Sequence, residues 1–166
     1  TNWNKNNNSV TLEMASKLSD HKLLRRFTAS LQSMNGDVLT AVKRTNLNGE
    51  QLDNIVTDAQ NSKVSVNTDM ILGLPNETYE SFQSGISELL EKNIMVETFP
   101  LIVLNNSEMN NPDYIKKYGM NIKKTKSHFS NFVEEYNHVV VGTKTLPSDQ
   151  FKRLWLWNWL TLMLDS

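Results

Sequence analysis

Residues 64–76 read VSVNTDMILGLPN, and this stretch decides the fold. Val64, Val66, Met70 and Leu72 fall on one face of an extended chain, because side chains alternate between two faces along a strand. The turn GLPN at 73–76 ends the strand, and apolar residues of helical period follow in residues 77–92. The stretch therefore predicts a strand, a tight turn and an amphipathic helix.

The same unit is repeated on both sides of this stretch. Residues 26–32, RFTASLQ, alternate in the same way and are followed by a polar loop and helical patterns, and residues 94–104 form a third, nearly all-apolar strand. Strands that alternate with helices of about 10–15 residues are typical of βαβ units. The sequence therefore predicts an α/β fold with a parallel sheet.

Two of the predicted strands carry a row of polar residues on one face: positions 26, 28, 30 and 32 in the first, and 65, 67 and 69 in the second. Parallel sheets normally have both faces covered, and burying an unpaired polar group costs about 1–3 kcal/mol. We therefore expect the rows to line a polar space, as in the ligand-filled lumen of a partial (β/α) barrel. The alternative is a polar strand face exposed to solvent.

The pattern changes after residue 110, so we divide the chain into a half-barrel, 1–110, and an extension, 111–166. The extension is expected to be mostly helical, with a helix at Pro112, a strand-like run at 136–141 and a last helix that begins near Pro147. The last helix is apolar on every side and holds Trp155, Trp157 and Trp159. A helix of this kind must be buried, so we expect it to pack on the barrel and on parts of the protein absent from this sequence.

Composition excludes several classes of protein. The 166 residues include 17 Lys+Arg, 18 Asp+Glu and no Cys, so nothing favours nucleic acid, and disulfides and thiolate metal ligands are excluded. No apolar run reaches the length of about 20 residues that spans a membrane, and the first ten residues are not those of a signal peptide. We expect a cytoplasmic protein with no membrane partner. The first residue is not Met, which suggests that the sequence begins inside a longer protein.

Five segments carry a resemblance to a known family. They are NWNKNNN (2–8), SLQSMN followed by VLTAVKRTNL (30–47), TDMILGLPNETYESF (68–82), FPLIVLNNSEMNNPDYIKKYG (99–119) and VVVGTKTLPSDQF (139–151). In this order they resemble the second half of a radical SAM barrel, in particular the group of that superfamily with a cobalamin-binding domain. The resemblance covers most of the chain.

This resemblance implies a site for S-adenosylmethionine on the polar strand faces. Arg26 would hold the cofactor's carboxylate, for which a planar fork of donors is suited, and Gln32 would lie beside its methionine or ribose part. Asp69 would face the ribose, Ile71 would contact the adenine, and Gly73 would shape the turn beside the adenine. The alternation agrees, since Arg26 shares a strand face with Gln32, and Asp69 shares one with Ile71.

The resemblance also implies cofactors that this chain does not hold alone. The family's CxxxCxxC motif for a [4Fe–4S] cluster, its Gly-Gly-Glu segment and its cobalamin domain lie upstream of the matching part and have no counterpart here. We therefore expect a C-terminal fragment of a cobalamin-dependent radical SAM enzyme. Its parent would be a methyltransferase on a small-molecule substrate, with rearrangement as the alternative reaction.

The missing N-terminal portion and an electron donor would be the other partners of that enzyme, and the fragment alone would be inactive. The rival hypothesis is a non-catalytic half-barrel that serves as a ligand-binding or interaction module.

Overall fold

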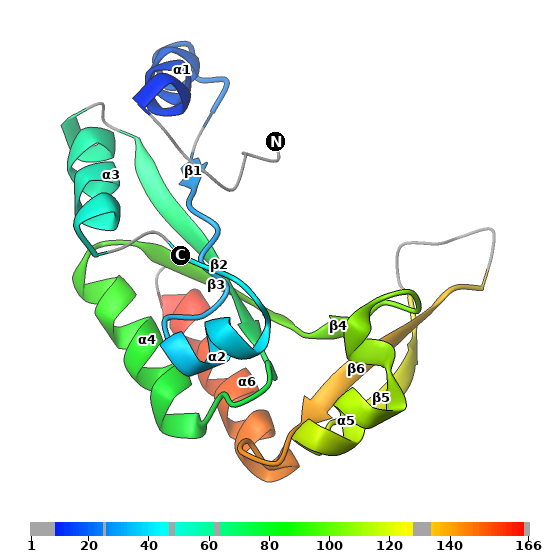
Figure 1. Cartoon of the computed structure of the whole chain (residues 1–166). Helices are drawn as coiled ribbons and strands as arrows, with labels where there is room; N and C mark the ends of the chain where they lie inside the picture. Colours follow the sequence, from blue (N-terminus) through cyan, green and yellow to red (C-terminus); the bar gives the residue numbers. More distant parts are fainter. Residues whose placement is uncertain (1–8, 25, 47–48, 62–63, 128–133, 165–166) are drawn as a thin grey trace.

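The computed structural model describes residues 9–24, 26–46, 49–61, 64–127 and 134–164 of the chain. The segment 2–8, which carries part of the resemblance, lies outside the described residues. The described chain forms a parallel sheet and an antiparallel sheet, and two separate hydrophobic clusters pack around them (Figure 1). The predicted α/β class with a parallel sheet is confirmed.

The parallel sheet has three strands in the order β1-β2-β3. These are β1 (Arg26–Thr28), β2 (Ser65–Leu72) and β3 (Met95–Pro100). β1 is shorter than the predicted strand 26–32, because the chain leaves the sheet after residue 28. It returns beside β2 at an isolated bridge between Gln32 and Met70.

Helices cover one face of this sheet. They are α1 (Ser9–Asp20), α3 (Gly49–Asn61), α4 (Tyr79–Glu91) and α6 (Ser148–Leu164). α4 begins directly after Thr78, because the hydroxyl of Thr78 accepts from the Ser81 N–H at 3.1 Å and the Ser81 hydroxyl accepts from the Thr78 N–H at 3.0 Å. The core between sheet and helices includes Phe27, Val66, Met70, Leu72, Val96, Leu52, Phe82, Ile86 and Leu154.

The antiparallel sheet has the order β4-β6-β5 and lies beyond the parallel sheet (Figure 1). Its strands are β4 (Ile102–Val103), β5 (Asn121–Lys126) and β6 (Tyr136–Gly142). A short 3-10 helix, η1 (Glu108–Asn110), and α5 (Pro112–Tyr118) connect β4 to β5, and α2 (Gly36–Ala41) follows β1. The second core contains Val38, Leu74, Leu101, Val103, Met120 and Val140.

The antiparallel sheet corrects two expectations from the sequence. The predicted strand 94–104 is divided at Leu101 between two sheets, because β4 pairs with β6 while β3 pairs with β2. The extension is mixed α/β and not mostly helical, since the Lys-rich run 121–126 is a strand paired with β6. The sheet of the extension therefore begins before residue 111.

The last helix, α6, is only partly buried by the described chain. Phe151 and Leu154 lie in the core, and the Thr98 hydroxyl donates to Asn158 Oδ1 at 2.7 Å, which fixes α6 to β3. Leu156 is 60% exposed and Trp159 54%, so the described chain covers only part of α6, and packing of the rest on parts absent from this sequence stays a prediction. In the described stretches, no helix is both long and apolar enough to cross a membrane.

Candidate functional site

The predicted site residues of β2 lie on the sheet face opposite the main core, which we call the polar face. It comprises Arg26 and Thr28 of β1, Asn67, Asp69 and Ile71 of β2, and Glu97 and Phe99 of β3. Residues paired across neighbouring strands point to the same side, so the register places Thr28 beside Asn67 and Asp69 beside Glu97. The Thr28 hydroxyl donates to Asn67 Oδ1 at 2.9 Å, which shows that the strands are joined by side chains as well as by backbone.

Arg26 lies on the polar face, as the alternation predicts, but at the amino ends of the strands. It pairs with Ser65, the first residue of β2, and its guanidinium lies 3.7 Å from the Glu97 carboxylate. Both side chains are close to half exposed, so this ion pair contributes little stability. Gln32 pairs with Met70, five residues further along β2, so the Arg26 and Gln32 backbones lie about 16 Å apart along the sheet.

Asp69 and Glu97 form a carboxylate pair across β2 and β3. Burial raises the pKa of the Asp69 carboxyl, and the charge of Glu97 raises it further. Like charges directly opposite each other in a sheet are destabilising, so the pair favours a ligand with positive charge or hydrogen-bond donors. Glu97 was not predicted as a site residue. As the one charged residue in the nearly all-apolar strand 94–104, it carried a sequence signal that could have identified it.

Gln32 lies at the carboxyl end of the sheet in an unusual conformation. Its φ is +65°, its N–H donates to the Asp69 carbonyl at 2.9 Å, and its own carbonyl accepts from the Ile71 N–H at 2.8 Å. The residue is 7% exposed, and among the described residues no group donates to its Oε1. Gln32 is thus held beside Asp69 and Ile71, with a buried amide oxygen that lacks a partner.

Gly73 ends β2 in a conformation that other residues rarely adopt, with φ +94°. A Cβ at this position would lie 3.1 Å from Phe151 Cε2 and 3.3 Å from Val140 Cγ1, so the turn packs closely against α6 and β6. Ile71 precedes it and is partly buried against the second core. The structure therefore places Gln32, Asp69, Ile71 and Gly73 along one end of β2, and Arg26 at the other end.

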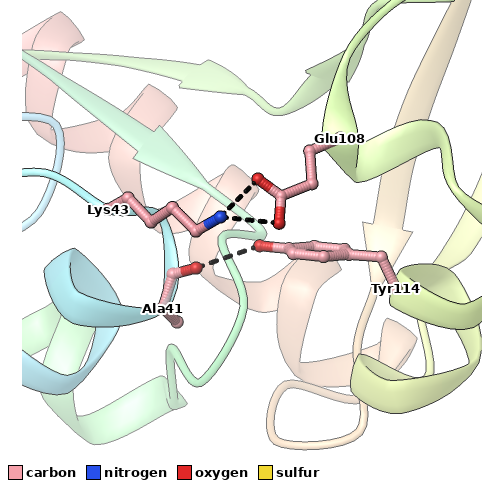
Figure 2. Close-up of polar contacts among 4 residues, drawn as sticks. All are labelled: Ala41, Lys43, Glu108 and Tyr114. Carbon is pink, nitrogen blue, oxygen red and sulfur yellow. Dashed lines mark hydrogen bonds and ion pairs between the residues drawn. The ribbon is translucent and has the colours of Figure 1, made fainter.

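A cleft of about 630 Å³ lies behind this end of the sheet, between the segment that follows β1 and the η1–α5 segment. Figure 2 shows its polar contacts: Lys43 Nζ lies 2.8 Å from each carboxylate oxygen of Glu108, and the Tyr114 hydroxyl donates to the Ala41 carbonyl at 3.2 Å. Burial, with smaller effects of Tyr118 and Glu108, raises the pKa of Tyr114 to about 12. These contacts join the two segments across the cleft.

The part of the chain that the structure describes contains no group of three or more His, Asp or Glu side chains placed to hold a metal ion. The polar face offers carboxylates, an amide, a guanidinium and an apolar end near Ile71.

The chain is similar in sequence to known proteins. No protein-family model matches the chain. Two curated relatives are each 33% identical over 121 residues, which is 72% of this chain and 18% of the relative. They are the cobalamin-dependent radical SAM methyltransferase TokK of Streptomyces tokunonensis and a 2-(S-pantetheinyl)-carbapenam-3-carboxylate methyltransferase of Streptantibioticus cattleyicolor.

Among solved structures, coproporphyrinogen III oxidase from Escherichia coli, described as a radical SAM enzyme, matches with a TM-score of 0.42 and 20% identity. That match covers 64% of this chain and 28% of the other. The chain spans less than a fifth of the length of its curated relatives. Both relatives are named as methyltransferases, and TokK is named as a cobalamin-dependent radical SAM enzyme.

Proposed function

We propose that the chain forms half of a radical SAM barrel, in a cobalamin-dependent methyltransferase that acts on a small molecule. Its polar face would hold the carboxylate, ribose and adenine of S-adenosylmethionine. The names of the homologues support the reaction class, and the parallel sheet with one polar face supports the half-barrel. In this proposal residues 1–110 are the half-barrel, and residues 111–166 pack on it and on the rest of the parent protein.

The observation that carries the proposal is the Gln32 side chain. Its buried Oε1 has no partner among the described residues, and its backbone has a positive φ. An unpaired buried carbonyl costs about 1–3 kcal/mol, and a left-handed residue other than Gly costs a further 1–3 kcal/mol or so. Strain of this kind is typical of ligand sites. A hydroxyl or ammonium group of the cofactor would supply the missing donor.

The other predicted site residues have roles that suit their positions. Asp69, beside Gln32, would accept from the ribose hydroxyls, and Ile71 with the Gly73 turn would contact the adenine. Arg26 now pairs with Glu97 and would exchange that partner for the cofactor's carboxylate. Each group would bind or orient the cofactor, and the cofactor, when bound in the parent protein, would supply the radical chemistry.

The residues of this chain do not fit a [4Fe–4S] cluster, because the cluster needs thiolate ligands and the 166 residues include no Cys. The cluster, the cobalamin and the contact with an electron donor are therefore proposed for other parts of the parent protein. By itself the chain is expected to bind S-adenosylmethionine weakly and to catalyse no reaction.

Gln32→Met tests the proposal, because Met keeps the length of the side chain and removes its amide. Calorimetric titration of the chain with S-adenosylmethionine should show affinity about ten-fold lower for the variant, the equivalent of one hydrogen bond. Its free energy of unfolding should rise by about 1 kcal/mol, because an unpaired buried carbonyl is gone.

Gln60→Met, at an exposed position of α3, is the matched control and should change neither quantity. Equal affinity of Gln32→Met and the original chain would contradict the proposal. Weaker binding accompanied by lower stability would instead assign Gln32 a structural role.

A further inference from the structure

The carboxylate of Glu77 is the most deeply buried charged group of the described chain. The residue lies in the turn between β2 and α4 and is 0% exposed. Among the described residues, no Lys, Arg or His forms an ion pair with it. Burial raises the pKa of this carboxyl, although hydrogen bonds from Ser81 and Ser33 oppose the rise. A group that is costly to bury in this way calls for an explanation.

Hydroxyl groups from two segments converge on this carboxylate. The Ser33 hydroxyl donates to Glu77 Oε2 at 2.7 Å, and the Ser81 hydroxyl donates to Oε1. A third hydroxyl, of Thr145, donates to the Glu77 backbone carbonyl at 2.7 Å. Glu77 therefore joins the loop after β1, the first turn of α4 and the segment between β6 and α6.

The bond to Ser33 is the one that reaches the candidate site. Ser33 directly follows Gln32, its N–H donates to the Leu31 carbonyl at 2.9 Å, and its hydroxyl also accepts from the Asn35 N–H at 3.1 Å. This tight turn sets the positive φ of Gln32. The Glu77 carboxylate is 44 residues away in sequence and acts on the turn from outside it. A hydrogen bond to a charged acceptor is stronger than a neutral one, so it can hold a strained turn in place.

We propose that Glu77 is a positioning residue: through Ser33 it holds the backbone turn that keeps Gln32 at the cofactor site. The role of Gln32 in this inference rests on the proposed function, whereas the clamp on the turn does not. In the sequence, Glu77 is the first residue of the helical pattern in residues 77–92 and shows no feature beyond that of an acidic residue at a helix start. The bond to Ser33 could not be read from the sequence, because it depends on how the two loops meet.

The test compares two variants that each remove one hydroxyl from the Glu77 carboxylate. Ser33→Ala removes the donor on the Gln32 side, and Ser81→Ala removes the donor on the α4 side, together with part of the cap. Hydrogen exchange of the backbone amides of residues 31–35 is measured in the full chain of 166 residues, and S-adenosylmethionine is titrated into each variant.

Ser33→Ala should speed exchange in residues 31–35 by about ten-fold and weaken S-adenosylmethionine binding by a similar factor, as expected for one lost hydrogen bond. Ser81→Ala should lower global stability through the weakened cap but leave exchange in 31–35 and affinity per folded molecule unchanged. If Ser33→Ala does not fold, Ser33→Cys replaces it, because the S–H group is a weak donor. Ser33→Cys should also speed exchange in residues 31–35 and weaken binding, by a smaller factor.

Unchanged exchange in 31–35 for Ser33→Ala, or equal effects of both variants, would overturn the inference. If the original chain shows no binding of S-adenosylmethionine, the proposed function fails, while the exchange data still decide whether Glu77 clamps the turn.

Discussion

Gly73→Ala tests whether the turn after β2 is held by its packing. The backbone φ of +94° costs a residue with a side chain about 1–2 kcal/mol. The added methyl group would meet Phe151 Cε2 at 3.1 Å and Val140 Cγ1 at 3.3 Å, and forcing a methyl group into a packed core costs about 1–3 kcal/mol. The two effects together predict a loss of about 2–5 kcal/mol in the free energy of unfolding.

Such a loss would be large against a typical domain stability of about 5–15 kcal/mol. Urea unfolding followed by tryptophan fluorescence is a suitable assay, because Trp155 and Trp157 lie on α6 close to Phe151 in sequence. Gly36→Ala is the control, since a Cβ there would meet no atom within 4 Å and α2 begins at this residue. The control should change stability by no more than about 0.5 kcal/mol. If Gly73→Ala were as mild as the control, the packing argument for this turn would be refuted.

Three further predictions concern buried polar groups. Because burial raises the folded-state pKa of Glu77, its protonated form favours folding: that contribution is complete below the ordinary pKa of 4.5 and is lost as pH rises through the raised value. Glu77→Gln removes the titrating carboxyl, so its free energy of unfolding should not fall over that pH range. Denaturation of both proteins across a pH series would detect the difference, and parallel pH profiles would contradict the prediction. Asn158→Ala should cost about 1–3 kcal/mol in urea unfolding, because the buried Thr98 hydroxyl loses this acceptor, and adding Thr98→Val should recover part of the loss. In a spectrophotometric titration, Tyr114→Phe should remove a phenolate transition near pH 12, and its persistence would show that another tyrosine produces it.

Local patterns were sufficient for part of this fold. The alternation in residues 64–72 places Asp69 and Ile71 on one face, and that face is the polar face of β2. The apolar residues of helical period in 77–92 predict a helix, and α4 occupies Tyr79–Glu91 of that range. Both features depend on residues close to each other in sequence, so the chemistry of a short segment determines them.

Features that depend on distant contacts could not be predicted in the same way. The division of 94–104 into β3 and β4 depends on the pairing of β4 with β6, which lies more than thirty residues later in the sequence. The run 121–126 contains three Lys and is mostly exposed, and its pairing with β6 makes it a strand. The positive φ of Gln32 interrupts the alternation of residues 26–32. Gln rarely adopts a positive φ, so its presence in the sequence does not predict this conformation.

The site is determined jointly by local and distant contacts. The alternation of side chains along the strand predicts that Arg26 lies on the polar face. It does not predict where along the sheet a residue lies. The register with β2 supplies that, and it puts Arg26 at the amino ends of the strands. The same register brings Glu97 opposite Asp69, which gives the face an acidic centre that neither strand predicts alone.

The antiparallel unit is part of the architecture that holds the candidate site. Leu74 of the turn after β2 and Val38 of the segment after β1 lie in the second core, together with Val140 of β6. Thr145 donates to the backbone of Glu77, and Glu77 in turn binds Ser33 beside Gln32. The loops that would contact the cofactor are therefore supported from behind by residues of the extension. Because packed interiors deform little, a change in the extension is expected to move the Gln32 turn even though no residue of the extension belongs to the proposed pocket.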